Sequence, residues 1–287
     1  ENFSVFYCYS INDPLLQSRS PLTAEKESGG SRMEYTTLRN GVTMPLEGFG
    51  VFQIPEAAVC EQAVLDALDT GYRLIDTAAY SNEEAVGAAL RKSGIPREEL
   101  FTTTKLLIQD AGYENVKQAF QTSLDKLGLD YLDLYLIHQP FGDYYGSWRA
   151  MEELYEAGKI RAIGVCNFYP ERLTDLACNA RIQPEAWGPL AEGNHGIFTH
   201  PLLTDIGKKY GKTPAQVVLR WNTQRGVVII PQSTHKERME QNLDIWDFIL
   251  SRDDMAAIGQ LDLGHSEIID HSAAETAKWL NGWKIHD

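Results

Sequence analysis

The chain has 287 residues, 43% of them hydrophobic and 10% aromatic, which is enough for one large α/β domain or two ordinary ones with a sizeable core. Its formal net charge of −14 argues against nucleic acid as a partner, because phosphate binding needs a basic surface. No apolar run approaches the ~20 residues that a membrane span needs. The four cysteines show no paired metal spacing, so we expect buried, reduced thiols in a cytoplasmic protein without a metal.

Residues 1–32 differ from the rest of the chain. They contain Ser-Arg-Ser-Pro and Glu-Ser-Gly-Gly-Ser and show no amphipathic period. We expect them to be a flexible extension or a cloning remnant. Strong patterning begins at Met33, and we expect residues 33–287 to form a single domain.

From Met33 onward, strand and helix signals alternate along the chain. The Asn40-Gly41 turn predicts a hairpin between Tyr35–Leu38 and Val42–Met44. Further strands are predicted at 46–52, 72–78, 100–105, 131–137, 160–165, 183–187 and 227–230. Helices are predicted at 55–69, 82–93, 113–127, 145–157, 170–179, 201–210, 214–224 and 235–242. Alternating apolar strands and helices indicate a parallel sheet covered by helices. The absence of a Gly-x-Gly-x-x-Gly after any strand favours an α/β barrel of the TIM type over a Rossmann sheet.

Four residues with acid–base chemistry stand at or just beyond strand ends. Asp76 ends an apolar strand and Tyr80 follows it, while Lys105 and His138 end the next two strands. In a parallel barrel these ends open onto one face, where the chemistry of such folds lies. In this order, the four residues resemble the catalytic tetrad of the aldo-keto reductases. The resemblance implies that Tyr80 is the general acid, its pKa lowered by Lys105, which pairs with Asp76, while His138 donates to the substrate carbonyl.

The spacing within this tetrad departs from the family in one place. Three residues separate Asp76 from Tyr80, whereas the family usually has four. The following Asn82-Glu83-Glu84 matches the family pattern and identifies the tyrosine. Because a shift of ~1 Å can matter greatly in catalysis, the placement of Tyr80 is the point that a structure must test.

A nucleotide site is expected after the strand at 227–230. Hydroxyls and an arginine at a helix start suit a phosphate, and the segment resembles the family's Ile-Pro-Lys-Ser motif. This implies that NADPH is the cofactor, with Gln232 replacing the usual lysine and weakening the preference for NADPH over NADH. The residues implied at the adenosine end are Ser233, Thr234, His235, Arg238 and Asn242. Those implied at the nicotinamide and pyrophosphate are Asn167, Trp187, Gly188 and Leu190.

The substrate pocket has weaker signals. Phe52 and Leu107 stand at strand ends where the family often has tryptophan, beside His138. Phe141, Tyr144 and Trp148 could equally line the pocket or belong to the core. The segment from Asp130 to Pro140 most resembles the bacterial-type branch similar to 2,5-diketo-gluconate and methylglyoxal reductases. This implies a small carbonyl substrate, and we expect a monomer.

Only seven barrel strands can be placed, one fewer than a TIM-type barrel needs. Ile182 runs straight into Gln183, where the family pattern has another βα unit of roughly thirty residues. Either the protein has lost this unit or the sequence omits it. Loss of the unit favours a second reading, a catalytically impaired barrel that binds nicotinamide nucleotide as a sensor or partner subunit.

Overall fold

The computed structural model describes residues 33–38, 40–80, 82–168, 185–186, 188–194, 196–261, 270 and 273–282. The chain divides into two compact units. The first unit comprises residues 1–48 and 182–268, and the second comprises residues 49–181 and 269–287. The predicted boundary at Ile182 and Gln183, the helix at 170–179 and residues 1–32 lie outside the described residues. Within the described ranges, no helix is long and apolar enough to cross a membrane.

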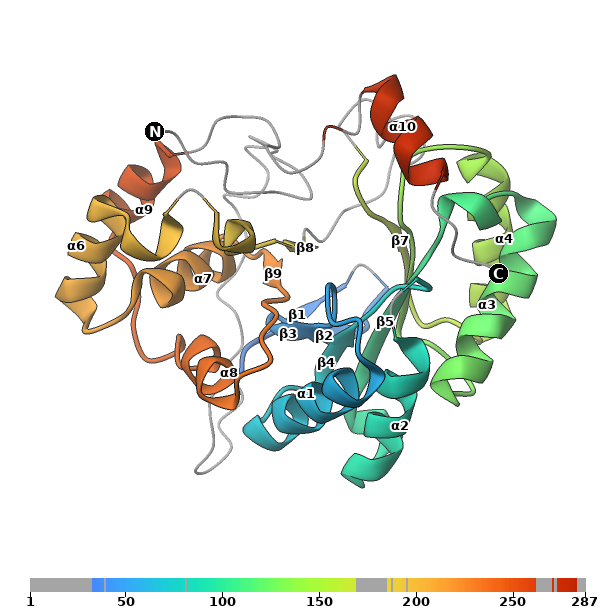
Figure 1. Cartoon of the computed structure of the whole chain (residues 1–287), viewed down its shortest axis with the longest axis horizontal. Helices are drawn as coiled ribbons and strands as arrows, with labels where there is room; N and C mark the ends of the chain where they lie inside the picture. Colours follow the sequence, from blue (N-terminus) through green and yellow to red (C-terminus); the bar gives the residue numbers. More distant parts are fainter. Residues whose placement is uncertain are drawn as a thin grey trace. The chain divides into compact units, whose positions relative to one another are not determined.

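The second unit contains a parallel sheet, and helices that pack against one another cover it (Figure 1). The sheet has the order β3-β4-β5-β6-β7, and the pairs from β4 to β7 are parallel. The strands are β3 (Gly48–Gly50, starting at the unit boundary), β4 (Leu74–Asp76), β5 (Phe101–Leu106), β6 (Leu134–Ile137) and β7 (Ile163–Val165). The helices are α1 (Ala57–Thr70), α2 (Glu83–Ser93), α3 (Tyr113–Leu127), α4 (Tyr144–Glu156) and α10 (Ala274–Asn281), with short 3-10 turns η2 (Arg97–Glu99) and η3 (Ile108–Asp110). The predicted parallel sheet with covering helices is confirmed.

Close packing between α2 and α3 depends on a glycine. A Cβ on Gly87 would lie 2.2 Å from the Leu127 carbonyl oxygen, so only glycine fits without a shift of backbone. Arg91 spans the same contact, and its Nη1 donates to Leu127 O at 3.0 Å. This contact packs the middle of α2, which begins three residues after Tyr80, against the end of α3.

A buried acid joins three elements of the second unit. Glu83, at the start of α2, is 1% exposed and accepts hydrogen bonds from Thr104 Oγ1 at 2.7 Å and Ser123 Oγ at 3.2 Å. Burial raises the pKa of Glu83, and these two hydroxyls offset only part of that rise. Glu83 therefore ties α2 to β5 and α3, at the cost of a carboxyl group held away from water.

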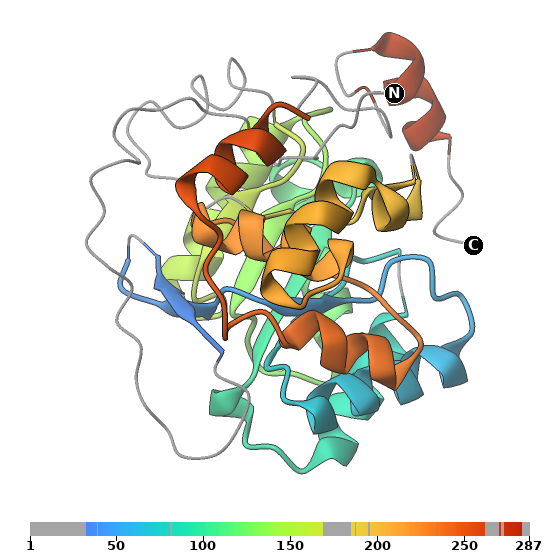
Figure 2. The ribbon, with the colours of Figure 1, turned by 90° about the vertical axis from the view of Figure 1, so that its left-hand side faces the viewer.

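The first unit begins with the expected hairpin. Strands β1 (Tyr35–Thr37) and β2 (Thr43–Pro45) are antiparallel, and the turn between them has Gly41 at φ +87°. Strands β8 (Glu185–Ala186) and β9 (Val228–Ile229) are parallel, and Glu47 bridges to Ile229 on the other side of β9. The helices of this unit are α6 (Pro201–Tyr210), α7 (Pro214–Gln224), α8 (Lys236–Leu243) and α9 (Arg252–Gly259), with 3-10 turns η4 (Ala191–Gly193) and η5 (Ile197–Thr199). Figure 2 shows α6 and α7 side by side, where they pack directly on one another.

Two helices lie where none was predicted. Helix α9 is eight residues long, and its N-cap is Ser251, whose side chain accepts from the Asp254 N–H. Helix α10 is equally short, and no side chain caps its start. Helices of this length present few periodic positions, which explains why the hydrophobic pattern did not reveal them.

Candidate active site

The structure brings together the four residues predicted to act as a tetrad, all in the second unit. Asp76 is the last residue of β4, Lys105 lies in β5, and His138 follows β6 directly. Lys105 Nζ donates to Asp76 Oδ2 at 2.5 Å and to the Thr77 carbonyl at 2.8 Å. Both Asp76 and Lys105 are 5% exposed. The ion pair expected from the sequence is therefore present and shielded from water.

Tyr80 reaches the same place despite its short loop. Its ring stacks on the His138 ring with centroids 5.3 Å apart and an interplanar angle of 9°. The Phe52 ring meets Tyr80 edge-on at 6.1 Å. Two residues after the tyrosine, Asn82 Nδ2 donates to the Pro55 carbonyl at 3.0 Å and also to the Ile54 carbonyl. Three residues between Asp76 and Tyr80 are thus enough to bring the phenol beside the histidine.

Burial and charge act in opposite directions on these groups. Burial raises the pKa of Asp76, and the ammonium of Lys105 offsets part of that rise. Burial also raises the pKa of Tyr80 above its ordinary value, while Lys105 pulls it down and Asp76 pushes it up. Lys105 acts on Tyr80 in the predicted direction, but desolvation of the phenolate is the larger effect. Tyr80 therefore holds its proton at neutral pH.

Asn167 stands at the end of β7 in a left-handed conformation, with φ +62°. Its Nδ2 donates to the His138 carbonyl at 2.8 Å and to Cys166 Sγ at 3.3 Å. With the amide nitrogen engaged, its oxygen is the group suited to accept from a carboxamide. The first of these hydrogen bonds fixes Asn167 to the backbone of His138.

Cys166 is a member of this site that the sequence prediction did not include. The thiol is buried and accepts a hydrogen bond from Asn167 Nδ2 at 3.3 Å, and a negative charge on it would raise the pKa of Tyr80. Its position at a strand end immediately before Asn167 was the available signal. Leu107, expected in the substrate pocket, is 4% exposed directly after β5. Tyr144 is half-buried, and its ring packs edge-on against the buried Phe168 at 5.2 Å.

The residues predicted to hold the adenosine end of the cofactor lie in the first unit, between β9 and the end of α8. Ser233 is buried, and its Oγ accepts from the His235 N–H at 3.1 Å. Asn242 is also buried, one residue before α8 ends. The exposed members of the set are Gln232, Thr234, His235 and Arg238.

This donor set suits a phosphate-bearing nucleotide. Hydroxyls and a guanidinium gather at the start of an eight-residue helix, and the N-cap residue His235 makes no side-chain capping hydrogen bond there. Gly188 is buried and Leu190 is half-buried, whereas Trp187 lies outside the described residues. Within those residues, no group of His, Cys, Asp or Glu side chains could hold a metal ion. The roles predicted for the individual site residues remain predictions.

Comparison with known proteins identifies the family. The model of the aldo/keto reductase family matches residues 48–187 and 199–263. The chain belongs to this family. It is therefore an oxidoreductase with an α/β fold of the TIM-barrel type, as the sequence predicted.

Similar proteins include enzymes named for small dicarbonyls. The chain is 45% identical to glyoxal reductase of Bacillus subtilis, covering 78% of this chain and 91% of that protein. It is 43% identical to methylglyoxal reductase DkgA of Escherichia coli, covering 79% and 93%. Among solved structures, the Bombyx mori aldo-keto reductase in complex with NADP has a TM-score of 0.76 and 34% identity, covering 83% of this chain and 95% of that one.

The same alignments bear on the gap predicted between Ile182 and Gln183. They run over 254 and 258 positions, yet 78% and 79% of 287 residues is only about 224 and 227. Roughly 30 positions of each relative therefore have no counterpart in this chain. That difference equals one βα unit, the size inferred from the sequence.

Proposed function

We propose that this chain reduces small aldehydes and ketones to alcohols with NADPH, and that dicarbonyls such as methylglyoxal are among its substrates. The observation that carries the proposal is the buried Asp76–Lys105 ion pair beside the Tyr80–His138 ring stack. The family and the names of the relatives at 43–45% identity support the reaction and the substrate class.

The tetrad supplies the proton of the reduction. When bound, NADPH supplies a hydride for the carbonyl carbon. Tyr80 gives its hydroxyl proton to the carbonyl oxygen, and the Lys105 ammonium stabilises the phenolate that remains. Asp76 holds Lys105 in place, while the His138 ring, stacked on Tyr80, orients the carbonyl through a hydrogen bond. All four residues belong to one unit of one chain, so a monomer suffices for this chemistry.

The segment from Gln232 to Asn242 would hold the adenosine end of NADPH. Arg238 at the start of α8 offers a guanidinium to the 2′-phosphate, and Ser233 and Thr234 offer hydroxyls. Asn167, fixed by its bond to the His138 carbonyl, would accept from the nicotinamide carboxamide. Gln232 brings no charge, so we expect NADPH to be preferred less strongly than with a lysine there.

The proposed reaction is tested by following NADPH oxidation with methylglyoxal as substrate. We expect turnover that depends on both NADPH and the aldehyde, together with formation of the corresponding alcohol. Glyoxal and a monoaldehyde of similar size serve as comparisons, because they separate dicarbonyl preference from general carbonyl reduction. NADPH binding without oxidation by any of these carbonyls would contradict the proposal.

A second candidate is a barrel that binds nicotinamide nucleotide but turns over poorly. The roughly 30 aligned positions without a counterpart here favour it. By the family pattern, the missing unit carries the second carboxamide ligand, and a lost buried hydrogen bond costs about 1–3 kcal/mol. Intact mass and turnover together separate the candidates. A mass matching 287 residues with slow turnover supports the second candidate, whereas a mass larger by one βα unit with brisk turnover supports the first. A mass matching 287 residues with brisk turnover would overturn the argument about the gap.

A further inference from the structure

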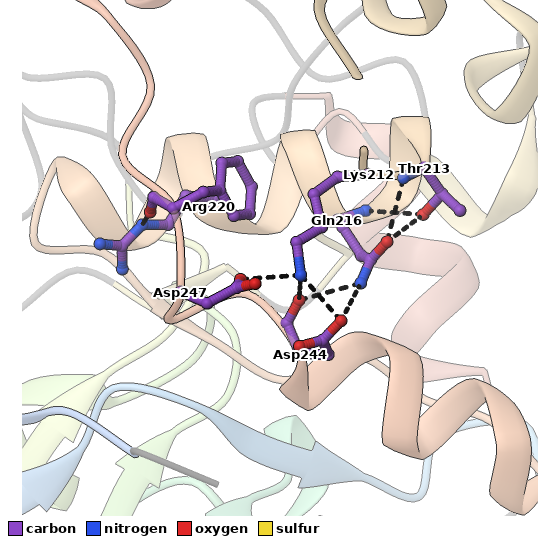
Figure 3. Close-up of polar contacts among 7 residues, drawn as sticks. Lys212, Thr213, Gln216, Arg220, Asp244 and Asp247 are labelled. Atoms are coloured by element: carbon purple, nitrogen blue, oxygen red, sulfur yellow. Dashed lines mark hydrogen bonds and ion pairs between the residues drawn. The ribbon is translucent and has the colours of Figure 1, made fainter. Parts of the chain in front are cut away.

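One face of α7 carries a row of polar side chains that holds the segment Asp244–Leu250, here called the strap. Gln216 Nε2 donates to the Asp244 carbonyl at 2.9 Å, and Arg220 Nε donates to the Phe248 carbonyl at 2.8 Å. Gln224 exchanges two hydrogen bonds with the backbone of Leu250, at 3.2 and 2.7 Å. Residues four apart share a helix face, so α7 binds the strap in order along its length. Figure 3 shows the part of this row that contains Gln216 and Arg220.

The start of the strap is held more tightly than the rest. Lys212, four residues before Gln216, donates from Nζ to the Asp244 carbonyl at 3.0 Å and to Asp244 Oδ2 at 2.8 Å. The same ammonium lies 2.7 Å from Asp247 Oδ1 (Figure 3). The Lys212 side chain is only 7% exposed, whereas the Asp244 and Asp247 side chains are 61% and 62% exposed. Two donors therefore converge on one residue, Asp244.

Gln216 is itself fixed before it reaches Asp244. The Thr213 N–H and hydroxyl both donate to Gln216 Oε1 at 3.0 Å, and the Gln216 N–H donates to Thr213 Oγ1 at 3.3 Å. This capping box orients the amide so that its nitrogen points at the Asp244 carbonyl. A side chain held at both ends loses little further freedom when it binds.

Asp244 is the C-cap of α8, and its N–H donates to the Glu240 and Gln241 carbonyls. Whatever holds Asp244 therefore holds the end of the helix. Arg238 and Asn242 lie four residues apart on one face of α8, and Asn242 is two residues before Asp244. We propose that Lys212 and Gln216 are positioning residues for the adenosine 2′-phosphate end of the cofactor, setting the affinity for NADPH by fixing α8. This inference rests on the proposed function.

A merely structural tie makes a different prediction. If the row on α7 only adds stability, loss of the amide donor of either Gln216 or Gln224 lowers the unfolding midpoint and leaves the affinity for NADPH unchanged. If the row positions α8, only the end at Asp244 affects the cofactor. Gln224 binds Leu250, six residues further on and next to the start of α9, so it is the matched control.

The test makes the same isosteric change at both ends. Gln216→Glu keeps the oxygen that Thr213 binds but replaces the donor facing Asp244 with an oxygen. Gln224→Glu likewise keeps the oxygen that accepts from the Leu250 N–H. It removes the Nε2 donor that binds the Leu250 carbonyl. Dissociation constants for NADPH and NADH are measured by titration, the unfolding midpoint by thermal denaturation, and kcat with methylglyoxal at saturating NADPH.

For Gln216→Glu we expect NADPH binding weakened about tenfold, NADH binding changed much less, and kcat at saturation retained. Gln224→Glu should bind NADPH like the wild type, even where its unfolding midpoint falls equally. Lys212→Met repeats the test from the other donor, should Gln216→Glu fail to fold. Equal NADPH affinities for the two glutamate variants would overturn the inference about Lys212 and Gln216. Turnover of methylglyoxal by the wild type would still support the proposed function in that case. If the wild-type chain binds no NADPH, both the proposed function and this inference are wrong.

Discussion

Replacement of Tyr80 by phenylalanine removes one oxygen atom from the proposed active site and little else. The phenol ring stacks on His138 at 5.3 Å and meets Phe52 at 6.1 Å, and a phenylalanine ring makes both contacts. The variant should therefore fold, with a change in unfolding free energy of about 1 kcal/mol, the net worth of one hydrogen-bonding hydroxyl. The proton donor, in contrast, is lost completely.

The size of the expected rate loss follows from that role. General acid catalysis is typically worth ~10²–10⁴-fold, which at 1.36 kcal/mol per factor of ten is roughly 3–5 kcal/mol of barrier. We expect kcat for methylglyoxal reduction to fall by that factor in Tyr80→Phe, while the dissociation constant for NADPH stays the same. Because burial raises the pKa of Tyr80 above its ordinary value of 10, wild-type kcat should decline on the alkaline side only above pH 10.

Tyr135→Phe is the matched control. Tyr135 lies in β6, is fully buried, and its hydroxyl has no hydrogen-bond partner among the described residues. Loss of that hydroxyl should leave kcat unchanged and the free energy of unfolding equal or higher. Unchanged turnover in Tyr80→Phe, or an equal loss in both variants, would refute the assignment of Tyr80 as the acid.

Two further predictions concern charge. Gln232 is exposed just before α8, so Gln232→Lys should tighten the binding of NADPH and leave the binding of NADH nearly unaffected. Paired titrations with the two nucleotides measure this. Equal effects on both would show that residue 232 does not sense the 2′-phosphate. The raised pKa of Glu83 means that its contribution to stability is full below its ordinary value of 4.5 and is lost as the pH rises. In urea unfolding at pH 5 and pH 8, Glu83→Gln should gain on the wild type as the pH rises, by at most about 1.4 kcal/mol per pH unit, and a difference that does not vary with pH would contradict this.

Sequence patterns predicted the parts of the structure that depend on periodicity and strand order. Asp76, Lys105 and His138 were found because parallel strands place their ends on one side, whatever the loops between them do. Some strands are shorter than predicted, as with β4 at Leu74–Asp76 against 72–78, although Thr77 and Ala79 still donate hydrogen bonds to β5. Periodicity also gives no sign of contacts such as the one between Gln216 and Asp244, which join side chains to the backbone of a distant segment.

The shortened loop before Tyr80 shows what fixes the geometry of this tetrad. Beyond the end of β4, the Thr77 N–H still donates to the Thr103 carbonyl at 2.9 Å, and the Ala79 N–H donates to the Lys105 carbonyl at 3.3 Å. Alternate residues thus continue to pair with β5 up to the residue before Tyr80. On the other side, Asn82 binds the Ile54 and Pro55 carbonyls. Since the chain is tied to the lysine-bearing strand immediately before the tyrosine, the position of the phenol depends on this pairing more than on the number of residues after Asp76. A missing residue in the loop is therefore compatible with an assembled tetrad.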